Sequence, residues 1–201
     1  MVSASGVFAD ELRLDKETRY QKKIMQIGFR ILNANQIDKR MTFYYSTNKD
    51  VNAVTYLSSK QLAVYKGILP FLDSDDELAA VIAHEISHGI EAHKGLWRRI
   101  VMSSNSKAYE FKADKNGVDL MVNAGYNPVA MIVMLNKISA EPCWFEVSSS
   151  HPGGIQQLVS IYEYIYSKYP EYLIDNDYKI FLLTTKEDRK DIRDKYLKKN
   201  I

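Results

Sequence analysis

The chain has 201 residues, enough for one domain with a sizeable core. Hydrophobic residues make up 46% and charged residues 26%, and the net charge of +2 is too small to indicate a nucleic-acid partner. The apolar runs are shorter than the about 20 residues that a membrane span needs, and the single Cys143 excludes an intrachain disulfide. We therefore expect no nucleic-acid binding and no transmembrane segment, and we leave peripheral membrane association open.

Residues 1–15 are predicted to be a leader. Val7-Phe8-Ala9 before Asp10 resembles the end of a signal peptidase site. However, neither the basic segment nor the apolar segment of a signal peptide precedes it. Two interpretations stay open: the numbering begins inside an exported precursor, or a loose leader precedes a cytosolic protein. We favour export, which would place the protein in the periplasm or cell envelope.

The first predicted domain element is a helix from residue 16 to about 33, where Ile24, Ile27 and Ile31 recur at helical spacing. Three short runs rich in β-branched and aromatic residues follow, at 41–46, 51–57 and 61–65, and predict a small sheet. The middle run is a candidate edge strand that could dock an extended peptide. A plain structural strand fits its spacing equally well.

The chain is predicted to be mostly helical from Ser74 onward. Ser74 and Glu77 have the spacing of a capping box at the start of a helix that should pack by an apolar stripe on one side and present His84 and His88 from another. Further helices are predicted at 104–124, with Gly125 as the C-terminal cap, at 127–139, with Asn127 as the N-cap, and at 155–169, and we interpret the tyrosines of the last one as a core stripe rather than a stacking face. One folded domain would then cover 16–170, and 171–201 would form a charged C-terminal extension.

The segment His84-Glu85-Ile86-Ser87-His88 is the most informative part of the sequence. On a helix, two histidines four positions apart are offset by only about 40°, so both imidazoles can bind one Zn²⁺ ion. Glu85 lies beside that ion rather than on it, which is the position of a general base for a metal-bound water. The alternative is a buried helix that carries this pattern by chance.

A catalytic zinc ion usually has three protein ligands, and the strongest candidate for the third is Glu110 on the next predicted helix. Asp114 shares the face of Glu110 and could accept a hydrogen bond from a ligand histidine. The alternative for both acidic residues is an exposed pair among nearby lysines. His151, before a Pro-Gly-Gly turn, could stabilise an oxyanion or could be an ordinary loop histidine.

These blocks resemble the gluzincin zinc metallopeptidases grouped with HtpX, BepA and the prenyl-protein endopeptidases. The resemblance covers about 52–158: the active-site helix is similar over 76–88, the third-ligand motif over 109–114, and the late histidine segment over 150–152. Asn52-Ala53, with 65–69, is similar to the family's edge strand and the turn after it.

The resemblance implies an α+β, mostly helical, zincin-like domain with a small sheet packed on the active-site helix. It implies one Zn²⁺ per chain and an endopeptidase that cleaves extended protein or peptide segments. It implies the ligands His84, His88 and Glu110, the base Glu85, assistance from His151, a hydrogen bond from a ligand histidine to Asp114, and substrate binding along a strand that includes Asn52, Ala53 and Val54.

The sequence also departs from the family pattern. The residues 57–60 stand where a Pro-Gly-Gly segment is usual, and Gln157 stands where an arginine is common. The appended membrane helices and repeats of relatives are absent from these 201 residues, so we expect a soluble minimal domain. An alternative function is a zinc-containing chaperone or binding module with little proteolysis.

Overall fold

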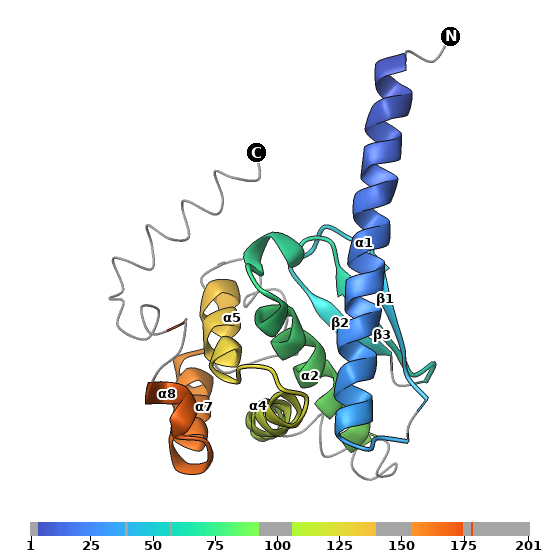
Figure 1. Cartoon of the computed structure of the whole chain (residues 1–201). Helices are drawn as coiled ribbons and strands as arrows, with labels where there is room; N and C mark the ends of the chain where they lie inside the picture. Colours follow the sequence, from blue (N-terminus) through green and yellow to red (C-terminus); the bar gives the residue numbers. More distant parts are fainter. Residues whose placement is uncertain are drawn as a thin grey trace.

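The computed structural model describes residues 4–38, 40–56, 58–92, 106–139, 154–174 and 178. Within these residues, helices accompany one three-stranded sheet, so the fold is α+β and mostly helical, as the sequence predicts (Figure 1). The elements in chain order are α1 (Ala4–Ala34), β1 (Thr42–Ser46), β2 (Ala53–Tyr56), β3 (Gln61–Tyr65), η1 (Leu69–Phe71), α2 (Asp75–Ala92), α4 (Ser106–Asn123), α5 (Val129–Ser139), α7 (Gly154–Lys168) and α8 (Glu171–Ile174).

The sheet has the strand order β1-β3-β2. β1 runs parallel to β3, whereas β2 pairs with β3 antiparallel, with Ala53 opposite Val64. Each strand falls within the run that predicted it. Among the described residues β2 pairs on one side only, which confirms that the middle run is an edge strand.

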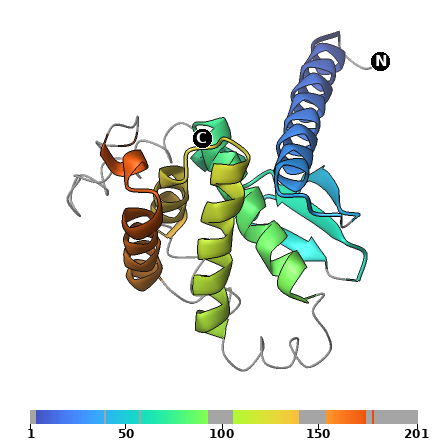
Figure 2. The same ribbon diagram turned by 60° about the horizontal axis from the view of Figure 1, so that its bottom comes forward.

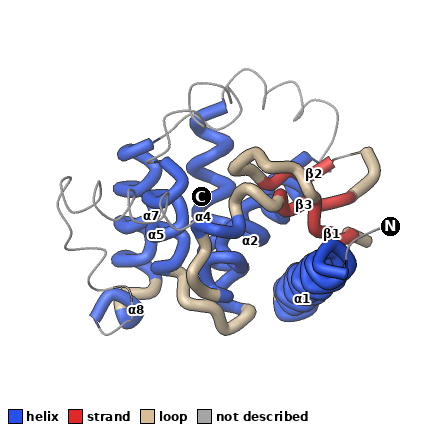
Figure 3. The backbone as a smooth tube through the Cα atoms, turned by 90° about the horizontal axis from the view of Figure 1, so that it is seen from above, coloured by secondary structure: helices blue, strands red, loops and turns tan. Residues whose placement is uncertain are grey.

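α2 lies at the centre of the molecule, between α1 and the sheet on one side and α4, α5 and α7 on the other (Figure 3). Every residue from 77 to 87 is buried. The sequence predicted a helix that packs by one side and presents its histidines from another, and this prediction was wrong. The apolar stripe is buried as expected, but α4 covers the polar side as well, a contact that the periodicity of one helix cannot reveal.

The start of α2 is fixed by polar contacts. Ser74 Oγ accepts a hydrogen bond from the N–H of Glu77 at 3.1 Å, which confirms the predicted N-cap. Glu77 reaches back to the N–H of Asp73 rather than to that of Ser74, at 3.2 Å. Its carboxylate also pairs with Lys137 of α5 at 2.6 Å, in a cluster that is buried on both sides. This ion pair joins α2 to α5, a contact that no pattern in the sequence predicts.

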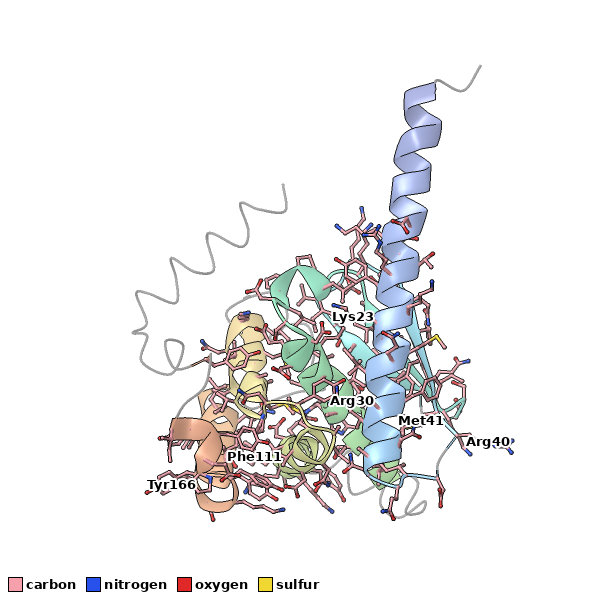
Figure 4. The ribbon with its side chains drawn as sticks, in the orientation of Figure 1. Lys23, Arg30, Arg40, Met41, Phe111 and Tyr166 are labelled. Atoms are coloured by element: carbon pink, nitrogen blue, oxygen red, sulfur yellow. The ribbon has the colours of Figure 1, made fainter. Side chains whose placement is uncertain are left out.

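The turn between α4 and α5 follows its predicted caps. Gly125 adopts a φ of +72°, a left-handed conformation that favours glycine, and Asn127 Oδ1 accepts the N–H of Val129 at 3.0 Å. Arg30 of α1 lies over the ring of Tyr126 with 4.5 Å between the guanidinium carbon and the ring centroid (Figure 4). The long first helix is thereby attached to the helical half of the molecule.

The interpretation of the α7 tyrosines as a core stripe was wrong for two of them. Ile161 and Ile165 form the buried face of α7, while Tyr162 is 43% and Tyr166 is 65% exposed. Tyr166 lies at the outer edge of the molecule in Figure 4. Helical spacing selects a face, but it does not show which of two apolar faces packs inward.

α1 begins at Ala4, so residues 4–15, which the sequence suggested as a leader, are the first turns of the helix that continues to Ala34. The N-terminal half of α1 extends beyond the rest of the described chain (Figure 1). No helix among the described residues has both the length and the apolar character needed to cross a membrane. Cys143 and the charged run 186–199 lie outside the described residues.

Candidate metal centre

His84 and His88 are on the side of α2 that faces α4. Their Nε2 atoms are 3.0 Å apart, and their rings meet edge to face with centroids 4.6 Å apart. A spacing of about one helical turn brings the two imidazoles to one point, as the motif predicted. His84 is 8% exposed, so this point lies below the protein surface.

Glu110 of α4 supplies a third ligand atom at the same point. Its Oε2 is 3.4 Å from His84 Nε2, and its Oε1 is 3.4 Å from His88 Nε2. In a tetrahedral site with bonds of about 2.0–2.1 Å, two ligand atoms are about 3.3 Å apart. The three side chains therefore have the spacing to hold a metal ion. They form a group of potential metal ligands among the described residues.

Asp114, one turn after Glu110, holds the first histidine. His84 Nδ1 donates to Asp114 Oδ1 at 2.9 Å, which leaves the Nε2 lone pair directed at the shared point. The other carboxylate oxygen, Oδ2, accepts a hydrogen bond from Gln157 Nε2 of α7 at 3.0 Å. Sequence reasoning assigned Gln157 no role, since it was noted only as a departure from an arginine.

α4 approaches the backbone of α2 closely at Gly117. A Cβ atom on Gly117 would lie 2.7 Å from Met131 Cε and 3.4 Å from the backbone nitrogen of His84. An alanine here would therefore displace the flexible end of Met131 and would touch the His84 backbone at ordinary contact distance. Figure 2 shows α4 running beside α2, with α7 on its other side.

Glu85 lies next to this point, in a pocket with about 430 Å³ of open space, solvent included. The pocket is lined by His84, Glu85, Glu110 and Gln157, by the β2 side through Asn52 and Ala53, and by the apolar residues Ile68, Val81, Met134 and Leu135. Thr55 Oγ1 donates to the backbone oxygen of Glu85 at 2.9 Å, so the edge strand is attached to α2 at this residue.

Comparison with known proteins agrees with this geometry. Residues 18–101 match the model of peptidase family M48. These residues are similar to peptidase family M48. The match contains His84, Glu85 and His88, whereas Glu110, Asp114 and Gln157 follow it in the sequence.

Curated relatives of this chain are proteases by name. The chain is 23% identical over 156 residues to the beta-barrel assembly-enhancing protease of Yersinia pestis, covering 58% of this chain and 32% of that protein. It is 30% identical over 128 residues to the mitochondrial metalloendopeptidase OMA1 of Arabidopsis thaliana, covering 49% of this chain and 26% of that protein. The chain therefore spans about a third or less of the length of these relatives.

The electrostatics of the candidate metal site favour positive charge at His84. Burial alone would lower the pKa of this histidine, but its hydrogen bonds to Asp114 and Glu110 outweigh burial and hold the pKa well above the ordinary value. Two buried carboxylates thus surround one imidazole. Such an arrangement suits a cation at the shared point, either a proton or a metal ion.

The structure describes the remaining predicted site residues less completely. Asn52 and Ala53 line the pocket, and Val54 follows them in β2. His151 lies outside the described residues, so its predicted role in stabilising an oxyanion stays a prediction.

Proposed function

We propose that this protein is a zinc-dependent endopeptidase that hydrolyses peptide bonds of extended protein segments. The observation that carries the proposal is the spacing of the nitrogen and oxygen atoms of His84, His88 and Glu110, at 3.0, 3.4 and 3.4 Å, beside the carboxylate of Glu85. Two imidazoles and one carboxylate are a known ligand set of catalytic zinc, and they leave a fourth position open for water or substrate. Similarity to peptidase family M48 supports the same conclusion.

Zinc at this point would lower the pKa of a water molecule toward about 7 and polarise a substrate carbonyl. The protein would supply the base. Glu85, which lines the same pocket as the ligands, would accept the proton of the attacking water and pass it to the leaving amine. Its backbone is fixed by the Thr55 hydrogen bond, which favours a constant position of the carboxylate relative to β2.

The substrate would lie along β2. The N–H of Tyr65 donates to the oxygen of Asn52 at 3.1 Å, so the backbone of Asn52 faces β3, and by alternation so does that of Val54. The backbone groups of Ala53 and Thr55 then face the open edge. An added peptide strand would pair with these two residues, while Asn52 and Ala53 also border the pocket.

The test is a comparison of wild type with Glu85→Gln. We expect the variant to keep stoichiometric zinc, because Glu85 is not a ligand, and to lose at least about 10²–10⁴-fold in kcat on unfolded casein. Glu163→Gln, which changes an exposed glutamate of α7, is the matched control and should keep both zinc and activity. Zinc is measured by elemental analysis and cleavage by release of soluble peptides.

The outcomes separate the alternatives raised by the sequence. A Glu85→Gln variant that cleaves casein at the wild-type rate would remove Glu85 as the base. Folded wild type with one zinc and no turnover on any unfolded substrate would favour a binding or chaperone module. Folded protein without stoichiometric metal would mean that the motif is fortuitous.

A further inference from the structure

Gln157 is almost fully buried at the start of α7, with 2% of its surface exposed. Its amide nitrogen is 3.0 Å from Asp114 Oδ2, and Asp114 itself is 1% exposed. Because an ionised carboxylate only accepts hydrogen bonds, the amide must present its N–H₂ group to it. A polar side chain buried to this degree is held by such a contact and is expensive to leave without one.

The two oxygens of Asp114 are therefore divided between two partners. Oδ1 accepts from His84 Nδ1 at 2.9 Å, and Oδ2 accepts from Gln157 Nε2 at 3.0 Å. The torsion that orients a carboxylate is broad when nothing restrains it. Because both oxygens are held, the plane of the carboxylate has one fixed orientation. That orientation determines the direction in which the imidazole N–H can point.

We propose that Gln157 is a positioning residue of the metal centre, which holds Asp114 so that the His84 ring directs Nε2 at the metal ion. The effect passes from α7 to α4 to α2, through two hydrogen bonds and no direct contact with the ion. The proposal rests on the proposed zinc site but not on turnover.

The chemistry of an amide makes this role distinct from that of a cation. Gln157 donates a hydrogen bond without neutralising Asp114, so the full negative charge of the carboxylate remains available to His84. Gln157→Met removes the hydrogen-bond donor and keeps a side chain of similar size. Gln157→Glu replaces the amide with a carboxylate. Gln156, the exposed neighbour on the same turn of α7, provides matched controls.

The experiment measures the zinc dissociation constant of folded protein by competition with a chromophoric chelator, together with the ligand-field spectrum of the Co²⁺ form. We expect Gln157→Met to weaken zinc binding by about tenfold, the lower end of the range for residues that support metal ligands. Gln157→Glu should weaken it more, because two buried carboxylates then face each other. Both should alter the cobalt spectrum, while Gln156→Met and Gln156→Glu should match wild type.

A double substitution separates positioning from general damage to the fold. Asp114→Asn combined with Gln157→Glu reverses donor and acceptor and restores one hydrogen bond with one negative charge. We expect the double variant to bind zinc at least threefold more tightly than Gln157→Glu alone. Such recovery is a pairwise coupling that independent structural defects do not produce.

The proposal fails if Gln157→Met and Gln157→Glu, folded by circular dichroism, keep the wild-type zinc affinity and cobalt spectrum. It also fails if the double variant binds zinc no more tightly than Gln157→Glu, because the losses of affinity from the two substitutions would then be independent. Wild type that binds zinc without cleaving casein would overturn the proposed function and leave this proposal standing. If Gln157→Met does not fold, the comparison of Gln157→Glu with the double variant decides the question.

Discussion

Two clusters of buried charge lie on α2, and they are completed in different ways. Near the start of the helix, Lys137 Nζ is 2.6 Å from Glu77 Oε2 and 2.9 Å from Asp73 Oδ2, so a cation of the chain faces its two carboxylates. Two turns further, the imidazoles of His84 and His88 and the carboxylate of Glu110 direct acceptor atoms at one point. The first cluster contains its own cation, and the second has the geometry to bind one.

This difference distinguishes a structural cluster from a functional one. Buried charges persist when they are paired or when they bind a metal ion. The lysine cluster joins α2 to α5 and has no need of a ligand. The histidine cluster joins α2 to α4, and its ligand atoms have the spacing that fits a metal ion. Breaking each cluster should therefore change a different measured quantity.

The largest expected effect is that of His88→Ala on metal binding. The variant loses one of three ligand atoms, so its zinc affinity should fall by more than the about 10- to 100-fold that is typical of changes around the ligands. The melting temperature of the metal-free protein should change little. Added zinc should raise the melting temperature of wild type, because a ligand of the native state stabilises it, but not that of the variant. Undiminished zinc by elemental analysis would remove His88 as a ligand.

The second largest effect is that of Lys137→Met on stability. Removing one partner of a buried ion pair leaves the Glu77 carboxylate without a cation and costs about 3–5 kcal/mol. Urea denaturation measures this loss as a lower midpoint at constant slope. The zinc affinity of the folded variant should equal that of wild type, which is the opposite pattern to His88→Ala. A loss of zinc affinity comparable to that of His88→Ala would show that the two clusters are not independent.

The stability of Lys137→Met should depend on pH, and the direction of this dependence can be predicted. Burial already raises the pKa of Glu77, and its contacts with Lys137 oppose that rise. Without Lys137 the pKa should rise further, so folding favours the protonated carboxyl. Stability is then lost as pH rises from the unfolded-state value through the folded-state pKa, and it is regained on acidification. The double variant Lys137→Met with Glu77→Gln should remove this dependence and be more stable than Lys137→Met alone near neutral pH.

Local patterns of the sequence predicted what one helix or turn determines. The motif at 84–88 identified the imidazoles, and the four-residue spacing of Glu110 and Asp114 identified one face of α4. The caps at Ser74 and Asn127 were found because a cap needs only a few neighbouring residues.

Contacts between distant segments were beyond the same reasoning. The Lys137–Glu77 pair joins residues 60 positions apart, and the Gln157–Asp114 bond joins residues 43 positions apart. Neither residue type is unusual on a helix, so no periodicity marks it as buried. The departure of Gln157 from the family pattern was the one available signal, and it identified the position without its partner.

The smallest expected effect concerns the cap that begins α2. Ser74→Ala removes the acceptor for the N–H of Glu77 and the hydrogen bond between Ser74 Oγ and Tyr178 OH, which are 2.6 Å apart. The cap alone is worth about 1 kcal/mol, which corresponds to a fall of about 2–4 °C in Tm for a chain of this size. Ser74→Asp retains an acceptor at the cap and should lose less. Zinc affinity should be unchanged in both variants, because the cap lies at the end of α2 that carries the lysine cluster. An altered affinity would mean that the start of α2 and its histidines move together, and the contrast between the two clusters would then have to be abandoned.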